Sequence, residues 1–342
     1  MEGIKKDNHY VPQAYLRQWL INDKILTYRL LVPHEKCEHW KPHSPKGIAK
    51  HQYLYTYFSG SKDSDEIERW LDREFEQPAS LSIAKVVNET RLSVKDWNNL
   101  FRFAVAQSIR TPTGMQSFMK RQNETLEALL SESMEGSVAK VEAALASGIK
   151  LEPASAVDPY SKLPLKLHRV KDEDGLEGIE ARVLNGRKFW IWQLEHILKN
   201  TIHRMPTHRW TILHAPTGVT WPTTDNPFTR LGVGASGELS LEGGWGVQGT
   251  RLFLPLSPKH LLFACVGQRP PPRGSTVSLS DAAFFRTMII NGASRYIFAT
   301  DTQDIVEFRP RTVSRELFDA EAKLWADWHA SQSEEEAQYP NL

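Results

Sequence analysis

The chain has 342 residues, of which 40% are hydrophobic and 24% are charged, and its formal net charge is +1. This composition excludes a disordered chain, and the small net charge removes any global electrostatic reason to expect nucleic-acid binding, although a local basic patch stays compatible with it. No stretch reaches the roughly 18 apolar residues of a membrane helix, and the N-terminus lacks the apolar core of a secretory signal. We therefore expect a cytoplasmic protein with no membrane partner.

The first half of the chain changes from strand-like to helical spacing. Short β-branched and aromatic segments predict strands over 24–33 and 52–58. From Ser64 the apolar residues recur at helical intervals, and we expect this first helix to end at Pro78. The pattern predicts further helices over 81–88, 93–112 and 115–145. Residues 64–147 are thus a predicted helical block.

The second half of the chain begins with a segment, 148–186, whose three prolines and acidic turn predict a long loop between two lobes. A helix over 189–205 follows. Strand-like spacing then predicts an antiparallel sheet built from segments 210–215, 219–224, 251–256 and 260–266. The remaining predicted elements are a helix over 280–290, a strand over 295–300 and a helix over 313–329.

Taken together, these elements predict an α+β fold. We expect a central helical block packed on a mainly antiparallel sheet that N-terminal and C-terminal segments contribute. The expected organisation is an N-terminal lobe over 1–147, the crossing over 148–186, a C-terminal lobe over 187–330 and a disordered acidic tail over 331–342.

Two weaker patterns have unremarkable interpretations. Gly232, Gly234 and Gly237 match a dinucleotide-binding spacing, but the glycine-rich sequence after them cannot form the helix that such a site requires, which favours a loop or hairpin. Potential zinc ligands lie close together at His34, Cys37, His39 and His43. Their spacing matches no zinc finger, so a solvated polar loop is the favoured interpretation of these residues.

Polar residues in two segments are candidate site residues. Gln107 and Arg110 lie three apart on a predicted helix and should point inward, either as a buried hydrogen-bond network or as a grip on phosphate or carboxylate. Asp225 and Asn226 follow a short predicted strand. The carboxylate can hold a metal or orient a base there, or it can form an Asx-turn that shapes the loop.

His9 lies in the apolar and aromatic run NHYVP, which should pin the N-terminus to the core. A pinned histidine can act as a general acid or base near neutral pH, and it can equally be a structural residue with satisfied hydrogen bonds. Both interpretations stay open at this point.

Several motifs together resemble a bacterial family known as domain of unknown function 4238. The matching runs are NHYVPQAYLRQW, QSIRTP, TTDNP and LPLSP, followed by Asn291 ahead of a strand ending in YIFATD. The resemblance spans nearly the whole chain and implies that certain polar residues converge in space: His9, Tyr10, Gln107, Arg110, Asp225, Asn226 and Asn291. It implies no activity, although such genes resemble members of bacterial defence or toxin–antitoxin neighbourhoods.

Our leading hypothesis is a bacterial toxin or anti-phage defence effector that acts on RNA or another phosphate-bearing substrate. His9 is the expected acid or base, and Asp225 either orients it or holds a divalent cation, the one cofactor that we consider. The expected substrate-binding residues are Tyr10, Gln107, Arg110, Asn226 and Asn291. The expected partners are RNA or a ribonucleoprotein, and an antitoxin or immunity protein.

Two other functions are open. One is a non-enzymatic toxin or binding protein that engages a protein or a ribosome-related ribonucleoprotein. The other is a small-molecule hydrolase or transferase. Under the binding hypothesis the same polar residues join the two lobes, so that replacing Arg110 lowers the melting temperature rather than an activity.

Overall fold

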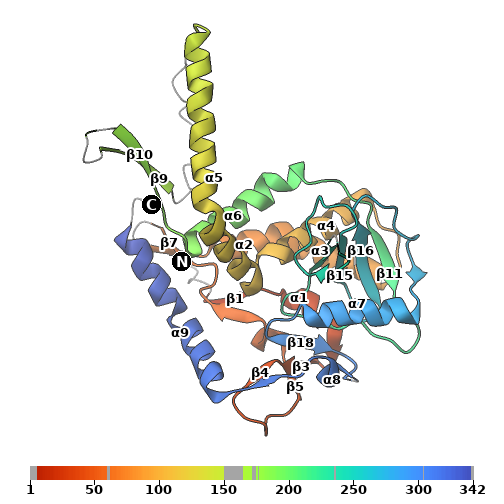
Figure 1. Cartoon of the computed structure of the whole chain (residues 1–342). Helices are drawn as coiled ribbons and strands as arrows, with labels where there is room; N and C mark the ends of the chain where they lie inside the picture. Colours follow the sequence, from red (N-terminus) through yellow and green to blue (C-terminus); the bar gives the residue numbers. More distant parts are fainter. Residues whose placement is uncertain are drawn as a thin grey trace.

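The computed structural model describes residues 6–59, 62–149, 165–171, 175, 177–234, 236–302 and 304–339, and it has the predicted α+β fold. Figure 1 shows the long helix α5 (Pro112–Ala146) and the hairpin of β9 (Leu165–Lys171) and β10 (Glu177–Val183) projecting from the rest of the chain. No helix in these ranges is long and apolar enough to cross a bilayer.

The N-terminal segment alternates short strands with single helical turns. Its elements are β1 (Asp7–His9), α1 (Gln13–Leu16), η1 (Arg17–Trp19), β2 (Leu20–Ile21), β3 (Lys24–Arg29), β4 (Leu31–Val32), β5 (Trp40–His43), η2 (Pro45–Gly47), β6 (Lys50–Gln52), β7 (Tyr57–Ser59) and β8 (Lys62–Ser64). The strand predicted over 24–33 corresponds to β3 and β4. The one predicted over 52–58 is wrong in its middle, because Tyr53 has a φ of 55° and starts a turn.

The helical block is confirmed, with one error at its start. Its elements are α2 (Glu66–Leu71), the π-helical turn η3 (Asp72–Glu76), α3 (Gln77–Val87), α4 (Val94–Ile109) and α5. The expected end of the first helix at Pro78 is wrong, because the π-helical turn precedes this proline and Pro78 lies in the first turn of α3. A proline there removes no hydrogen bond that the helix needs.

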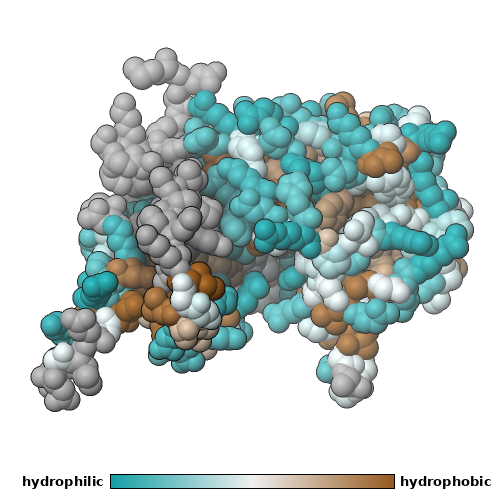
Figure 2. All heavy atoms as spheres, turned by 90° about the horizontal axis from the view of Figure 1, so that it is seen from above, coloured by the Kyte–Doolittle hydropathy of each residue, from teal (hydrophilic) through white to brown (hydrophobic). Residues whose placement is uncertain are grey.

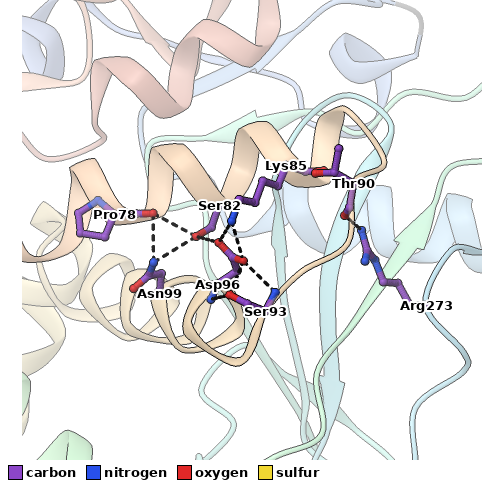
Figure 3. Close-up of polar contacts among 8 residues, drawn as sticks. All are labelled: Pro78, Ser82, Lys85, Thr90, Ser93, Asp96, Asn99 and Arg273. Atoms are coloured by element: carbon purple, nitrogen blue, oxygen red, sulfur yellow. Dashed lines mark hydrogen bonds and ion pairs between the residues drawn. The ribbon is translucent and has the colours of Figure 1, made fainter.

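The start of α4 is held by a polar cluster, drawn in Figure 3. The Ser93 hydroxyl accepts from the Asp96 backbone N–H, and the Asp96 carboxylate accepts from the Ser93 N–H, which makes a capping box. The same carboxylate accepts from Ser82 and from Lys85 on α3. Hydrogen bonds from Ser93 and Lys85 hold the pKa of Asp96 well below its ordinary range, so one charged side chain caps α4 and ties it to α3.

The predicted crossing over 148–186 is only partly a loop. Residues 150–164 lie outside the described ranges, but β9 and β10 pair along their whole length, from Glu177 with Lys171 to Val183 with Leu165. The expectation of a loop is wrong for these strands, because the alternating sequence LKLHRVK is compatible with an exposed hairpin.

One sheet has six strands in the order β14-β13-β15-β16-β11-β17, antiparallel except for the last pair. The strands are β11 (Thr211–His214), β13 (Thr229–Val233), β14 (Leu239–Ser240), β15 (Arg251–Pro255), β16 (His260–Cys265) and β17 (Ser275–Thr276). Gly232 pairs with Ser240 between β13 and β14. The glycine-rich stretch is therefore a hairpin and has no helix after it.

The second sheet joins the two ends of the chain, as predicted. Its order is β12-β18-β3-β2, and β5 pairs with β3. The strand predicted over 219–224 is shorter, β12 (Thr223–Thr224), and its predicted place in the sheet with the other three segments is wrong, because β12 pairs with β18 (Tyr296–Ala299). In turn, β18 pairs with β3. A further strand, β19 (Thr312–Val313), runs parallel to β4. Sheet formation thus brings the N-terminal segment next to residues that lie far along the chain.

The remaining helices are α6 (Arg187–Lys199), η4 (Thr201–Arg204), α7 (Leu279–Asn291), α8 (Ile305–Phe308) and α9 (Arg315–Gln338). The expected disorder from residue 331 is wrong up to Gln338, because α9 continues to that residue. Glu336 is buried there, with its Oε2 2.7 Å from Nη2 of the equally buried Arg187. The acidic sequence predicts a solvated tail, but the Glu336 carboxylate forms a buried ion pair with Arg187.

The main hydrophobic core draws on both predicted lobes. Tyr15 and Trp19 from the N-terminus, Phe103 from α4, Trp190 from α6 and Leu254 from β15 belong to one cluster of buried residues. The hydroxyl of Tyr15 donates to the carbonyl of Pro255 over 2.7 Å. The helical block and the six-stranded sheet therefore share one apolar interior.

Candidate functional site

A cavity of about 670 Å³ lies where the helical block meets the six-stranded sheet. Its walls come from the C-terminal end of α4, the first turns of α5, α6, β13, the segment after β14 and the chain just after α7. The view from above in Figure 2 is mostly hydrophilic, and hydrophobic residues form separate patches on that face. The cavity is thus a stronger candidate site than any extended apolar face in that view.

The lining of this cavity is unusually rich in arginine. Arg121, Arg230 and Arg309 line it, and Glu242 is the only carboxylate among the described lining residues. Burial, and then the nearby charge of Arg121, lower the pKa of Arg230, and the charge of Glu242 acts in the opposite direction. Two guanidinium groups are therefore close enough to repel each other, which favours an anion between them.

Two buried polar atoms at the cavity have no hydrogen-bond partner among the described residues. They are Nε of Arg309, a donor, and Oε1 of Gln193, an acceptor. A buried polar atom without a partner costs about 1–3 kcal/mol. Because native proteins seldom leave such groups unsatisfied, a ligand or water that fills the cavity is the expected partner.

The N-terminus of α5 forms another wall of the cavity. Thr111 caps this helix, Pro112 occupies its first turn, and Thr113 and Gly114 line the cavity. A side chain at Gly114 would place its Cβ 2.9 Å from the backbone of Ile109, so this glycine permits the close approach of α5 to α4. The positive end of a 35-residue helix thus adds to the charge of the arginines.

Asn226 and Asn291, both predicted to bind substrate, line the cavity. The Asn226 side chain accepts from the Thr111 hydroxyl over 3.2 Å and donates to the carbonyl of Gly292 over 3.2 Å. It therefore joins the start of α5 to the end of α7. Asn291 is exposed in the last turn of α7, and its amide is the more available of the two for a ligand.

Arg110 lies behind the cavity in the core rather than in its wall. The side chain is fully buried, and its Nη1 lies 2.6 Å from Oε1 of Glu76. Its Nη2 donates to the carbonyl of His9 over 2.7 Å, and its Nε donates to the hydroxyl of Tyr55 over 3.2 Å. The N-terminal motif and the QSIRTP motif therefore meet as predicted, but through a guanidinium whose charge is already compensated.

His9 and Gln107 are likewise buried and do not line the cavity. The His9 ring lies with Nε2 3.3 Å from the carbonyl of Lys46, and only 7% of the residue is exposed. Neither amide atom of Gln107 has a hydrogen-bond partner among the described residues. Neither placement brings these side chains to a ligand in the cavity.

Asp225 and Tyr10 are also buried, and neither lines the cavity. The Asp225 carboxylate accepts from the backbone N–H groups of Ser294 and Arg295 over 2.9 and 2.8 Å. Burial raises the pKa of Asp225 to about 6 in spite of these bonds. Burial and the charge of Asp225 also hold the pKa of Tyr10 well above its ordinary value. Asp225 thus shapes the chain before β18, but not as an Asx-turn, because its oxygens accept from N–H groups 69 and 70 residues further along the chain.

The sequence analysis missed the residues that give the cavity its charge. Arg230 follows the TTDNP motif in an apolar strand, and an arginine in such a strand is a signal that could have been noticed. Arg121 lies on a helix face that carries other polar residues, such as Ser117 and Thr125, whereas Gln193 shares its face with the apolar Trp190 and Ile197. Arg309 follows a short helical turn, and nothing near it in sequence marks it.

In the described ranges, the residues of the expected polar loop around Cys37 do not gather into a group of three metal-ligating side chains. Cys37 Sγ lies 3.5 Å from Nδ1 of His34, and His43 instead has its Nδ1 3.1 Å from the carbonyl of Lys41. The described residues do contain one group of three metal-ligating side chains, but neither Cys37 nor these two histidines belong to it. A cation held by Asp225 also lacks support, since backbone N–H groups point at both of its oxygens.

Comparison with known proteins yields one family. The family model described as "Protein of unknown function (DUF4238)" matches residues 7–303. No curated protein and no solved structure matches the chain. The matched range contains the start of α5, β13 and the end of α7, and therefore most of the cavity wall.

Proposed function

The chain belongs to the DUF4238 family, and from the geometry of its cavity we propose that it binds and acts on RNA or another phosphate-bearing substrate. The observation that carries this proposal is the set of Arg121, Arg230 and Arg309 around one cavity with a single carboxylate, Glu242, in its described lining. Anions bind where guanidinium groups and a helix N-terminus converge.

The volume of the cavity suits a nucleotide or the end of an RNA strand. Small-molecule sites commonly enclose about 300–1,000 Å³, and this cavity encloses about 670 Å³. Phe118 and Trp245 line the same space, and the Trp245 ring stacks on Phe228 with 5.0 Å between the ring centroids. A cavity lined by both arginines and aromatic rings suits a ligand with a phosphate and a base.

His9 and Asp225 take a different role in this proposal from the one expected. Because the structure buries both outside the cavity wall, they position the N-terminal segment and the chain before β18 instead of contacting the substrate. Tyr10, Gln107 and Arg110 belong to the same supporting layer. Among the residues predicted to bind substrate, Asn226 and Asn291 line the cavity, and they are the ones that contact the ligand in this proposal.

The biological setting that we propose is a bacterial toxin or anti-phage defence effector in the cytoplasm. This part rests on the resemblance of such genes to members of defence and toxin–antitoxin neighbourhoods. An antitoxin or immunity protein is then the expected protein partner, and it would act by closing access to the cavity.

A small-molecule hydrolase or transferase is the second candidate. The size of the cavity favours it, because a space of about 670 Å³ holds a mononucleotide but only one end of a polymer. Both candidates use the same arginines. They differ in whether the chain distinguishes a free nucleotide from an RNA strand.

The test is a calorimetric titration with ATP and with a 5′-phosphorylated RNA oligonucleotide. We compare the wild type, an Arg121→Ala/Arg230→Ala variant and an Arg73→Ala control, whose side chain is 70% exposed and away from the cavity. Hydrogen bonds to charged groups are worth about 1.5–3 kcal/mol, so we expect the double variant to lose at least about tenfold in affinity. The control should bind like the wild type.

The two ligands separate the two candidates. Binding of RNA but not ATP supports the effector, and binding of ATP alone supports the small-molecule enzyme. The proposal is wrong if the wild type binds neither ligand, or if the double variant binds as tightly as the Arg73→Ala control. Growth after induced expression tests the effector itself, which predicts toxicity and RNA cleavage that the double variant lacks at equal soluble yield.

A further inference from the structure

We infer that Glu89, His214 and His260 form a binding site for a divalent transition metal ion such as Zn²⁺. Glu89 follows α3, His214 ends β11 and His260 begins β16, so three separate segments supply the donors. None of these residues lines the arginine-rich cavity. Two imidazoles and one carboxylate are a ligand set that zinc accepts with a fourth position left for water.

The donor atoms are already close to one another. His214 and His260 are direct partners in the antiparallel pairing of β11 with β16, and their ring centroids are 5.0 Å apart. Nε2 of His260 lies 2.7 Å and Nε2 of His214 lies 3.3 Å from Oε1 of Glu89. Donors around a tetrahedral zinc with bonds of 2.0–2.1 Å are about 3.3 Å apart. Small side-chain adjustments therefore suffice to admit the ion.

The surroundings hold these side chains in place. Nδ1 of His260 lies 2.7 Å from the hydroxyl of Ser257, a contact of the kind that orients histidine ligands and leaves Nε2 for the metal. Glu89 has a φ of 54°, and its N–H donates to the carbonyl of Val86, which fixes its backbone in a tight turn after α3. The site thus has a second layer of contacts, as metal sites require.

The exposure of two of the side chains suits an open site. Side-chain exposure is 56% for Glu89 and 26% for His214, so water can reach the fourth position. The neighbouring cation is Arg273, whose guanidinium donates to the carbonyl of Thr90 over 2.7 Å, as Figure 3 shows. Its charge and that of Lys259 oppose an incoming cation, and they make the expected affinity lower than that of a closed four-ligand site.

The experiment measures Zn²⁺ binding to the chelator-treated full chain by calorimetry, and metal content by mass spectrometry after dialysis. A Cys37→Ser background removes the other pair of potential zinc ligands, Cys37 and His34. We expect one tight Zn²⁺ per chain in this background. The affinity should fall at least about tenfold in Glu89→Gln and in His214→Ala, and about tenfold in Ser257→Ala through lost orientation. The matched control is His203→Ala, an exposed histidine on η4.

Thermal melting gives a second readout that needs no activity. Zn²⁺ should raise the melting temperature of the parent chain and of His203→Ala, and it should leave Glu89→Gln and His214→Ala unchanged. A parent chain that takes up no Zn²⁺ overturns the inference and leaves a hydrogen-bonded Glu–His–His group. Equal Zn²⁺ affinity of His214→Ala and His203→Ala overturns it as well. Circular dichroism confirms that each variant is folded.

Discussion

Two groups of arginines in this chain show how burial separates a structural charge from a binding charge. Arg110 and Arg187 are fully buried, and each faces a carboxylate and further acceptors within hydrogen-bond distance. Arg230 and Arg121 repel each other across the cavity, and Nε of Arg309 has no partner among the described residues. A compensated guanidinium holds the fold together, whereas an uncompensated one favours an anion from outside.

The arginines that line the cavity are not the ones that the sequence motifs suggest. Arg110, the arginine of the QSIRTP motif, belongs to the compensated group. The arginines at the cavity lie outside those motifs or at their edges. The arginine of the motif therefore lies in the core, and the arginines that line the cavity come from outside the motifs.

The largest expected effect comes from breaking the compensated group. Replacing Arg110 with alanine leaves the carboxylate of Glu76 and the carbonyl of His9 without their buried partner. Removal of one member of a buried pair costs about 3–5 kcal/mol, and urea denaturation should show this loss. The control Arg73→Ala, at an exposed ion pair, should change stability by at most about 1 kcal/mol. Equal losses in both variants would contradict the structural role of Arg110.

A similar loss is expected at the other compensated arginine. Among the described residues, Glu336→Ala leaves the Arg187 guanidinium with His329 and Ser333 as hydrogen-bond partners and with no carboxylate, and we expect a cost of about 3 kcal/mol. Glu334→Ala is the matched control, because this side chain is exposed on the same helix. Denaturation midpoints of the two variants measure the difference. If Glu336→Ala were as stable as Glu334→Ala, the end of α9 would not be anchored as the structure shows it.

The pH dependence of stability tests Asp225. Its pKa in the folded chain is about 6, above the ordinary 3.8, so the protonated carboxyl stabilises the fold. That contribution is complete below pH about 4 and is lost as the pH rises through 6, which amounts to about 3 kcal/mol at pH 7. The stability of Asp225→Asn relative to the wild type should therefore increase by about this amount from pH 4 to pH 7. A flat difference across this range would refute the raised pKa.

A smaller effect, of opposite sign, is expected at Gln107. Its amide is fully buried, and neither of its polar atoms has a partner among the described residues. Gln107→Met keeps the length of the side chain and removes the unsatisfied atoms, so we expect a gain of about 1 kcal/mol in the free energy of unfolding. Chemical denaturation of both chains checks the sign. A loss would show that the amide has a partner that matters.

Helices with local signals can be predicted from the sequence, whereas strand pairings and contacts with distant partners cannot. The capping box of Ser93 and Asp96 and the apolar spacing after it locate α4 and the start of α5, because these signals are local. The hairpin of β9 and β10 and the last turns of α9 were missed. The hairpin depends on strand pairing, which the alternation in LKLHRVK permits but does not specify. The end of α9 depends on a distant partner, Arg187 for Glu336, which no local pattern reveals.

The site was predictable only in part for the same reason. The motifs predict that their polar residues converge. Asn226 and Asn291 do line the same cavity, and Arg110 does contact the carbonyl of His9. They could not show which arginine would be compensated, since Glu76 lies far from Arg110 in sequence. The charge of the cavity depends on α5, β13 and the chain after α8 meeting in space.

The measurement that tests the contrast between the two groups most directly is thermal melting of Arg230→Ala and the wild type, with and without ATP or 5′-phosphorylated RNA. Arg230→Ala should be as stable as the wild type without ligand, to within about 0.5 kcal/mol, because it removes a repelled charge rather than a paired one. The ligand should raise the melting temperature of the wild type alone. If the variant is several kcal/mol less stable, yet keeps the full ligand-induced shift, Arg230 is a structural charge and not a binding charge.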